Sequence, residues 1–276
     1  MKVSDTRGYS LLVLPATVYL ALVFVVPLAM LIVGSLIVDG APTLQSYTRY
    51  LGDAHNRATV WTTVRYAFLS SLLCLVLGYP FARLMARATG MTQALLFAAL
   101  LLPLSLSLMV RAFGWTILLS REGPLNLLLV WLGVVDQPIR LLFTETGLIL
   151  GTLSIKLPLM ILPIYVVLKT IPEELGQAGA SLGAGPVYRF FKLDLPLAMP
   201  GMLAGFALVF SQCAAAYVLP TLLGGARYLI MSKAIVDSYL ILQAGTVGST
   251  ISVLLLLIVV AVIAATGVAT RRRGMA

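Results

Sequence analysis

The residue types that usually carry bond chemistry are rare in this sequence. Its one histidine, His55, lies in a polar segment with no cysteine or acid at ligand spacing, so a metal site is not expected. The two cysteines, Cys74 and Cys213, lie inside apolar runs and are expected to be buried free thiols. The sequence contains no Ser/His/Asp grouping, P-loop or GxGxxG motif. We therefore expect neither an enzyme nor a metal or cofactor held by this chain.

Polar side chains inside apolar stretches are the other candidates for chemistry. They are Lys156, Ser211, Gln212, Tyr217 and Arg111. Such groups cost free energy in an apolar environment, so each needs a partner or a function. Lys156 could be a structural cation paired with a carbonyl or an acid, or it could contact an anionic part of a ligand. Ser211 and Gln212 could hydrogen-bond between helices, and Arg111 could reach outward to water or act in gating.

The composition shows what kind of environment these residues occupy. Of 276 residues, 60% are hydrophobic and 11% are charged, and the mean hydropathy is +1.02. An ordinary soluble domain has about 25% charged residues, so most of this chain is expected to lie in a lipid bilayer. The net charge of +9 fits the Lys and Arg enrichment of cytoplasmic loops in membrane proteins. Basic runs with interleaved aromatic residues are missing outside the loops, which argues against nucleic acid as a partner.

Six apolar stretches are long enough for membrane-spanning helices, which need about 20 residues each. They are residues 9–38, 58–82, 95–120, 146–168, 197–220 and 251–269. The basic start resembles a signal peptide, but the apolar run is much longer than the roughly 7–15 residues of such peptides, so we expect a retained first helix. No internal repeat is visible. The sequence predicts an all-α, polytopic membrane protein with a single membrane domain over residues 1–276.

Charge placement indicates the orientation in the membrane. The sequence RLMAR lies in a short segment without acids, and RRR directly follows the last apolar stretch. Lys and Arg concentrate on the cytoplasmic side, so we expect both termini and residues 171–197 to be cytoplasmic. Residues 39–57, 121–145 and 221–250 are then external. The middle one has a short apolar centre that predicts an interfacial or partly re-entrant helix, with Trp131 as an interface anchor.

Residues 171–197 differ from their apolar surroundings because they combine small residues with mixed charges. Pro172 suits the first position of a helix, and Glu173 and Glu174 suit its positive N-terminus. Gly183 is a natural C-terminal stop, after which Gly185 and Pro186 begin a second helix. We predict a cytoplasmic helix–turn–helix whose small residues allow close approach of another protein. The alternative is an amphipathic loop resting on lipid headgroups, although the first helix lacks the basic polar face of such helices.

This segment resembles the EAA motif of ABC-importer permeases, which runs E-A-A, three residues, G, nine residues, I-x-L-P. The matching positions are Gln177, Ala178, Gly179, Gly183, Leu193, Leu195 and Pro196. Gln replaces the usual Glu, Gly replaces the second Ala, and Leu replaces Ile. Outside the motif, CLVLGYPFARLMAR, LLPLSLSLMVRAFGWTILLSREGPLNLLL, WLGVVDQPIRLLFT and LPTLLGG resemble blocks of the polyamine (spermidine/putrescine) importer permeases. Together these cover most of the chain from about residue 60 to 225.

The resemblance implies a type I ABC-importer permease that hydrolyses nothing itself. Its partners would be a cytoplasmic ABC ATPase dimer that holds ATP and Mg, a second permease subunit expected to be a different chain, and a periplasmic solute-binding protein. The residues expected to dock the ATPase are Pro172, Glu173, Glu174, Gln177, Ala178, Gly179, Gly183, Pro186, Phe190 and Pro196. The chain is expected in the bacterial inner membrane.

The solute stays open between a polyamine and a related small organic compound. The Lys156 ammonium would repel a polyamine, whereas the aromatic face of Tyr217 could attract one. Two other classes of protein remain as alternatives. A self-sufficient secondary transporter would need carboxylates inside the spans and two related halves, neither of which the sequence has. A membrane-embedded enzyme would need the catalytic grouping that is missing.

Overall fold

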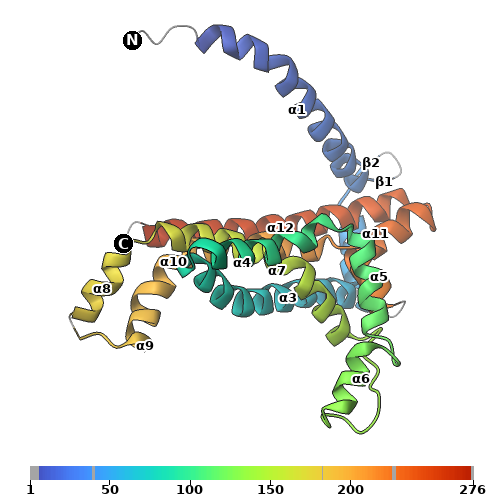
Figure 1. The fold of residues 1–276 in the computed structure, drawn as a ribbon. Coiled ribbons are helices and arrows are strands. Elements are labelled where there is room, and N and C mark those ends of the chain that lie inside the picture. Colours follow the sequence, from blue (N-terminus) through green and yellow to red (C-terminus); the bar gives the residue numbers. More distant parts are fainter. Residues whose placement is uncertain (1–5, 39–40, 182, 226–227, 275–276) are drawn as a thin grey trace. The chain divides into compact units, whose positions relative to one another are not determined.

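The structure is a computed structural model that describes residues 6–38, 41–181, 183–225 and 228–274 (Figure 1). The chain divides into two compact units, which are described separately. The first comprises Met1–Arg57 and Ala234–Leu256, and the second comprises Ala58–Lys233 and Leu257–Ala276. The prediction of a single membrane domain stays a prediction.

The first unit begins with the long apolar helix α1 (Thr6–Leu36). A two-stranded hairpin follows, in which β1 (Ile37–Val38) pairs antiparallel with β2 (Ala41–Pro42), so that Ile37 lies opposite Pro42. The chain continues into α2 (Gln45–Gly52). Ser35 joins these elements, since its hydroxyl lies 2.6 Å from that of Tyr47. The hairpin has two residues per strand, so the chain stays in the all-α class.

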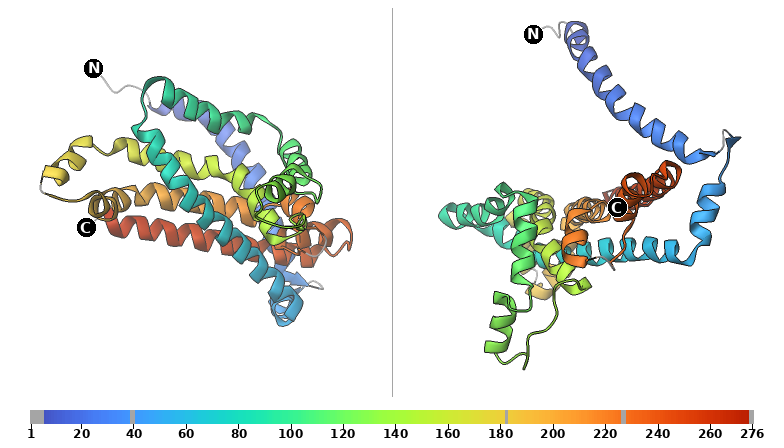
Figure 2. Two further views of the ribbon diagram at one scale, coloured as in Figure 1. Left: turned by 60° about the horizontal axis from the view of Figure 1, so that its bottom comes forward. Right: turned by 90° about the vertical axis from the view of Figure 1, so that its right-hand side faces the viewer.

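The second unit is built on long helices that lie side by side (Figures 1 and 2). They are α3 (Ala54–Arg87), which begins in the first unit, α7 (Glu145–Thr170) and α10 (Leu195–Ala214). Hydrogen bonds join α3 to α7 at two levels. The hydroxyls of Tyr66 and Thr152 are 2.8 Å apart in the buried centre, and Lys169 Nζ donates to the carbonyl of Ala86 at 3.1 Å near the ends.

Helices α7 and α10 approach each other closely because α10 carries glycine where they cross. A Cβ atom added at Gly201 would lie 2.7 Å from the carbonyl oxygen of Pro163 and 3.0 Å from Cα of Ile164. A Cβ atom at Gly205 would lie 3.0 Å from the carbonyl oxygen of Met160. Small residues at the interface are the usual way for membrane helices to pack backbone against backbone. The α7–α10 pair is therefore held by close packing.

Five helices in the described residues are long and apolar enough to cross a membrane, or six if one bent pair counts as a span. The bent pair corresponds to the apolar stretch at 95–120, which contains Pro103. Gly90–Ser105 (α4, Gly90–Leu101, and the 3₁₀ turn η1, Leu102–Ser105) meets α5 (Leu108–Leu118) at 98°. Pro103 lies in η1, just before the break, and has no N–H to bond the preceding turn of α4.

The fifth predicted span, 197–220, ends earlier than expected. Helix α10 stops at Ala214, and a π-helical turn, η3 (Pro220–Gly224), follows a short irregular stretch. Pro220 cannot donate to the carbonyl of Ala216, as an α-helix would require. The hydroxyl of Ser232 donates to that carbonyl instead, at 2.5 Å. Tyr217 therefore lies beyond the end of α10, and its predicted place inside a helix was wrong.

The connections predicted to be external contain helices that the sequence only partly predicted. The predicted short helix in 121–145 is confirmed as α6 (Pro124–Trp131), with the Trp131 side chain 81% exposed. Asn126 holds this connection together, because its Nδ2 donates to the carbonyls of Ser120 and Ile139 at 2.9 and 3.0 Å. Helix α2 was not foreseen, nor was α11 (Met231–Leu240). The last span is α12 (Gly245–Gly274).

Candidate docking segment and solute cavity

Residues 171–197 form a short helical hairpin, which we call the docking segment. Its first helix, α8 (Glu173–Ser181), ends at Gly183, whose φ is 78°. The N–H of Gly183 donates to the carbonyl of Ala180 at 2.9 Å, and the N–H of Ala184 donates to that of Gly179 at 3.0 Å. These two bonds form a Schellman motif, which favours glycine at the left-handed position. The prediction that Gly183 ends the helix is confirmed.

The second helix of the docking segment is α9 (Pro186–Arg189), and Pro186 begins it as predicted. Pro172 lies one residue before α8 rather than at its first position. Pro196 lies in the first turn of α10. The two helices lie together beyond the ends of α7 and α10 (Figures 1 and 2). The docking segment is thus a helix–turn–helix, as the sequence predicted.

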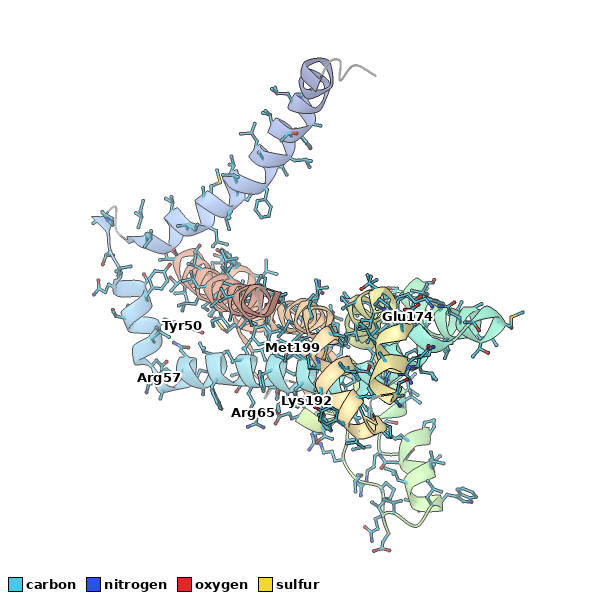
Figure 3. All side chains as sticks on the ribbon, turned by 90° about the vertical axis from the view of Figure 1, so that its left-hand side faces the viewer. Tyr50, Arg57, Arg65, Glu174, Lys192 and Met199 are labelled. Carbon is cyan, nitrogen blue, oxygen red and sulfur yellow. The ribbon has the colours of Figure 1, made fainter. Side chains whose placement is uncertain are left out.

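The exposed residues of α8 are small or polar, apart from Leu175, which is 45% exposed. Glu174, Gln177 and Ala178 are exposed, whereas the side chain of Glu173 lies outside the described part of the chain. Figure 3 shows Glu174 on α8 and Lys192 in the segment after α9. Gly179 faces inward, since a Cβ atom there would lie 3.1 Å from Cδ1 of Leu193. The small residues therefore serve both the outer surface and the contact inside the hairpin.

Phe190 anchors the hairpin to the end of α3. It begins a π-helical turn, η2 (Phe190–Asp194), and its ring meets that of Tyr79 edge-on with centroids 5.7 Å apart. The guanidinium carbon of Arg83 lies 5.4 Å from the centroid of the same ring. Phe190 was predicted on the docking face, but it is half-buried in this internal contact. Val187, Tyr188 and Phe191 are left on the surface, with 69%, 61% and 58% exposure.

Ion pairs strengthen the same anchor. The carboxylate of Asp194 pairs with the guanidinium of Arg83, and Arg87 Nη2 lies 3.7 Å from Asp194 Oδ2. The Asp194 side chain is 22% exposed and that of Arg83 is 30% exposed, so solvent screens this pair only in part. The sequence reasoning did not select Asp194 or Arg83, although both lie in segments that it quoted. The missing signal was their proximity, which depends on how the hairpin folds back onto α3.

A cavity of about 600 Å³ lies between the docking segment and the ends of α3 and α7. Its charged lining residues are Arg83, Arg87, Lys169, Arg189 and Asp194, and Gln177 also lines it. Four cations against one acid make the cavity basic. The carbonyl ends of α3 and α7 compensate part of this charge through their helix dipoles. Gln177 is both exposed and part of the lining of this cavity.

Replacement of Asp194 by Asn should loosen the docking segment without removing any helix. We expect Asp194→Asn to lower the free energy of unfolding by about 1 kcal/mol, because the partly buried Arg83 loses its counter-ion. Protease cleavage within residues 171–197 should become faster than in the wild type. The matched control is Asp136→Asn in the external connection, where no ion pair is found in the described residues. Equal cleavage rates in the wild type and Asp194→Asn would contradict the anchor.

A second, smaller cavity of about 280 Å³ lies where α5, α7 and α10 come near one another. Four of the five polar residues selected from the sequence line it, namely Lys156, Ser211, Gln212 and Tyr217. Its other lining residues are Leu108, Ala215, Ala216, Val218 and Leu219. The structure thus brings together residues that are about 60 positions apart along the chain. We call this the solute cavity.

Lys156 is 8% exposed and connects two helices at this cavity. Its Nζ atom donates to Oε1 of Gln212 at 3.2 Å, which joins α7 to α10. Ser211 behaves differently from the expectation of a bond between helices, because its hydroxyl donates to the carbonyl of Ala207 in its own helix at 2.7 Å. The Tyr217 side chain is 39% exposed. Of the two residues proposed as links between helices, only Gln212 acts as one in the described part of the chain.

Arg111 lies on α5, one turn after Leu108, but does not itself line the solute cavity. Its Nε and Nη1 atoms are buried and have no hydrogen-bond partner among the described residues. The Arg111 residue as a whole is half-buried, so the prediction that it reaches outward to water stays a prediction. The residue lies beside the cavity as a second cation.

Comparisons with known proteins agree with the fold and extend it to a family. The spermidine/putrescine transport system permease protein PotB of Escherichia coli (strain K12) is 34% identical over 216 residues, which are 78% of this chain and 78% of that protein. A solved bacterial ABC transporter involved in the import of the acidic polysaccharide alginate has a TM-score of 0.79 at 13% identity, covering 96% of this chain and 94% of that chain. The same transporter with an alginate pentasaccharide-bound periplasmic protein gives 0.77 at 14% identity, covering 96% and 93%.

The structural likeness shows a type I ABC-importer permease fold, which confirms the predicted fold class. The PotB relative is a transport permease and not an enzyme. Residues 78–273 match the family described as "Binding-protein-dependent transport system inner membrane component". The match covers most of the chain. This protein therefore belongs to the family of inner membrane components of binding-protein-dependent transport systems.

Proposed function

We propose that this chain forms one half of the solute path of an ATP-driven importer in the bacterial inner membrane. A second permease subunit, which is a different chain, forms the other half. A cytoplasmic ABC ATPase dimer binds the docking segment and holds ATP and Mg. A periplasmic solute-binding protein delivers the solute from outside. Both termini and the docking segment face the cytoplasm, in agreement with the basic RLMAR and RRR sequences.

The observation that carries this proposal is the way the docking segment is built. It presents an outer surface of mainly small and polar residues, while its inner side is fixed to α3 by Phe190 and Asp194. Mechanical coupling needs an element that moves as a body with its neighbours. A loop that only rests on lipid headgroups would need neither the aromatic anchor nor the ion pairs. The anchored hairpin favours a docking role over that alternative.

The solute is a small organic compound that is a polyamine or is related to one. The name of the PotB relative, with 34% identity, supports this class. The cavity lined by Lys156, Gln212 and Tyr217 is the candidate contact site on this half of the path. Its volume of about 280 Å³ suits part of a small solute, since sites for a whole drug-sized ligand are about 300–1,000 Å³.

Uptake into vesicles tests the proposal. The chain is reconstituted alone, or together with its ATPase, second permease and binding protein, and the uptake of radiolabelled spermidine and putrescine is measured with and without ATP. We expect any uptake of these solutes to require all subunits and ATP together. Solute movement by the chain alone would favour a secondary transporter and contradict the proposal. If the complete system takes up another solute with ATP but neither of the two polyamines, the proposed importer stands and these two solutes are excluded.

A further inference from the structure

We propose that the solute cavity binds an acidic group of the transported solute, a carboxylate or another oxyanion. The inference rests on the proposed function, because it assumes that the cavity belongs to the solute path, and it narrows the solute class. The solute would then be a small compound related to polyamines that also carries an acidic group. A bare polyamine would not satisfy the cavity.

The first argument is the charge of Lys156, which has no counter-ion in the described chain. Its one hydrogen bond there goes to the neutral amide oxygen of Gln212. Ion pairs among the described residues join Arg65 to Glu145 and join Asp194 to two arginines, all away from this cavity. A buried charge without a counter-ion is strongly unfavourable. An anion beside the Lys156 ammonium group would remove this cost, and the described residues supply none.

The second argument is Arg111, a cation on α5 that lies one turn after the lining residue Leu108. Its Nε and Nη1 atoms are buried without a hydrogen-bond partner in the described residues. Two cations close to each other in an apolar region repel, and that repulsion disappears when an anion lies between or beside them. Guanidinium and ammonium groups both form strong, charge-assisted hydrogen bonds with carboxylates. Arg111 and Lys156 therefore call for the same kind of ligand.

The third argument is the set of hydrogen-bond donors around the cavity. An ammonium group has three donors, and Lys156 uses one of them on Gln212. Because Oε1 of Gln212 accepts that bond, its NH₂ group remains available as a donor. A carboxylate is an acceptor with about four lone-pair positions, so it matches this set. An alkylammonium group of a polyamine is a donor and would meet other donors here.

A purely structural role explains these observations less well. Lys156 and Gln212 do join α7 to α10, but those helices are already packed backbone against backbone at Gly201 and Gly205. A buried ion adds little to such a contact and is often replaceable by apolar residues. A lysine that served only to link these helices would not need to face an open cavity. Lys156 instead lines an open cavity together with three other polar side chains.

A four-carbon series tests the charge of the bound group. The complex of permeases and ATPase is purified without the binding protein, and its thermal unfolding midpoint is measured with putrescine, 4-aminobutyrate or succinate. These probes have equal chain length and carry no, one or two carboxylates. We expect both carboxylate-containing probes to raise the midpoint of the wild type and putrescine to leave it unchanged. Lys156→Met should weaken the apparent affinity for 4-aminobutyrate by at least about tenfold, because a charge-assisted bond is lost.

Controls separate this inference from the proposed function. Lys156→Arg keeps the charge and should retain protection. Lys233→Met in α11 removes a cation that does not line the cavity and should match the wild type. ATPase co-purification should be equal in all variants, and its loss from the wild type would instead contradict the proposed function. The inference is overturned by protection that putrescine alone provides, by protection unchanged in Lys156→Met, or by no protection from either carboxylate. A carboxylate side chain of the second permease at Lys156 Nζ would also overturn it.

Discussion

Replacement of Ala178 by Trp is expected to separate this chain from its ATPase while leaving it folded in the membrane. Ala178 lies on the outer surface of α8, one turn after Glu174, and is exposed. A large ring there would hold a docking partner away from the helix backbone. Interface positions that require close approach lose about 2 kcal/mol or more when disturbed, which is more than a tenfold change in affinity. Affinity purification of the tagged chain, followed by quantification of bound ATPase, measures the effect.

The matched control for this variant is Thr89→Trp. Thr89 is also exposed and lies in the short connection between α3 and α4, outside the docking segment. It should retain the ATPase at the wild-type level. Gly179 and Gly183 are less suitable positions, because Gly179 packs against Leu193 and Gly183 needs a positive φ of 78°. Tryptophan at either would deform the hairpin itself. Normal amounts of ATPase on Ala178→Trp would rule out α8 as the docking helix.

Much of this fold follows from local sequence properties. Length and apolarity predict the long helices, because a helix is the way to satisfy backbone hydrogen bonds in lipid. The hairpin of the docking segment also follows, since Gly183 and Pro186 act through their own backbone preferences. The close packing of α7 and α10 could not be predicted, although Gly201 and Gly205 are visible in the sequence. Which helix faces these glycines depends on contacts between distant segments.

The departures from continuous helices occur at prolines. Pro103 and Pro220 both interrupt stretches that hydropathy reads as continuous, and hydropathy does not register a missing N–H. The anchor between Asp194 and Arg83 joins residues 111 positions apart, so neither residue could be selected alone. The polar residues of the solute cavity, in contrast, could be predicted from the sequence. They were recognisable one by one because each is unusual inside an apolar span.

The two candidate sites share the same pair of helices, which suggests how they are coupled. Helix α7 carries Lys156 and ends just before α8, and α10 carries Gln212 and begins just after η2. A shift of the docking segment would therefore move both walls of the solute cavity. Because α7 and α10 pack backbone against backbone, they should move together and not bend independently. In the proposed cycle, closure of the ATPase would act on the cavity through this helix pair.

That coupling depends on the glycine contacts, and Gly201→Ala tests them with a single methyl group. The added Cβ would lie 2.7 Å from the Pro163 carbonyl oxygen, so the helices must separate, at a cost of about 1–3 kcal/mol in the free energy of unfolding. The transport rate should fall together with the free energy of unfolding.

The control is Gly267→Ala in α12, where no atom lies within 4 Å of the new Cβ. Alanine favours helix over glycine by up to about 1 kcal/mol, so this control should be neutral or stabilising. Denaturant titration of the purified protein measures both variants. If the two substitutions change stability in the same direction and by the same amount, the close contact between α7 and α10 does not hold the pair together.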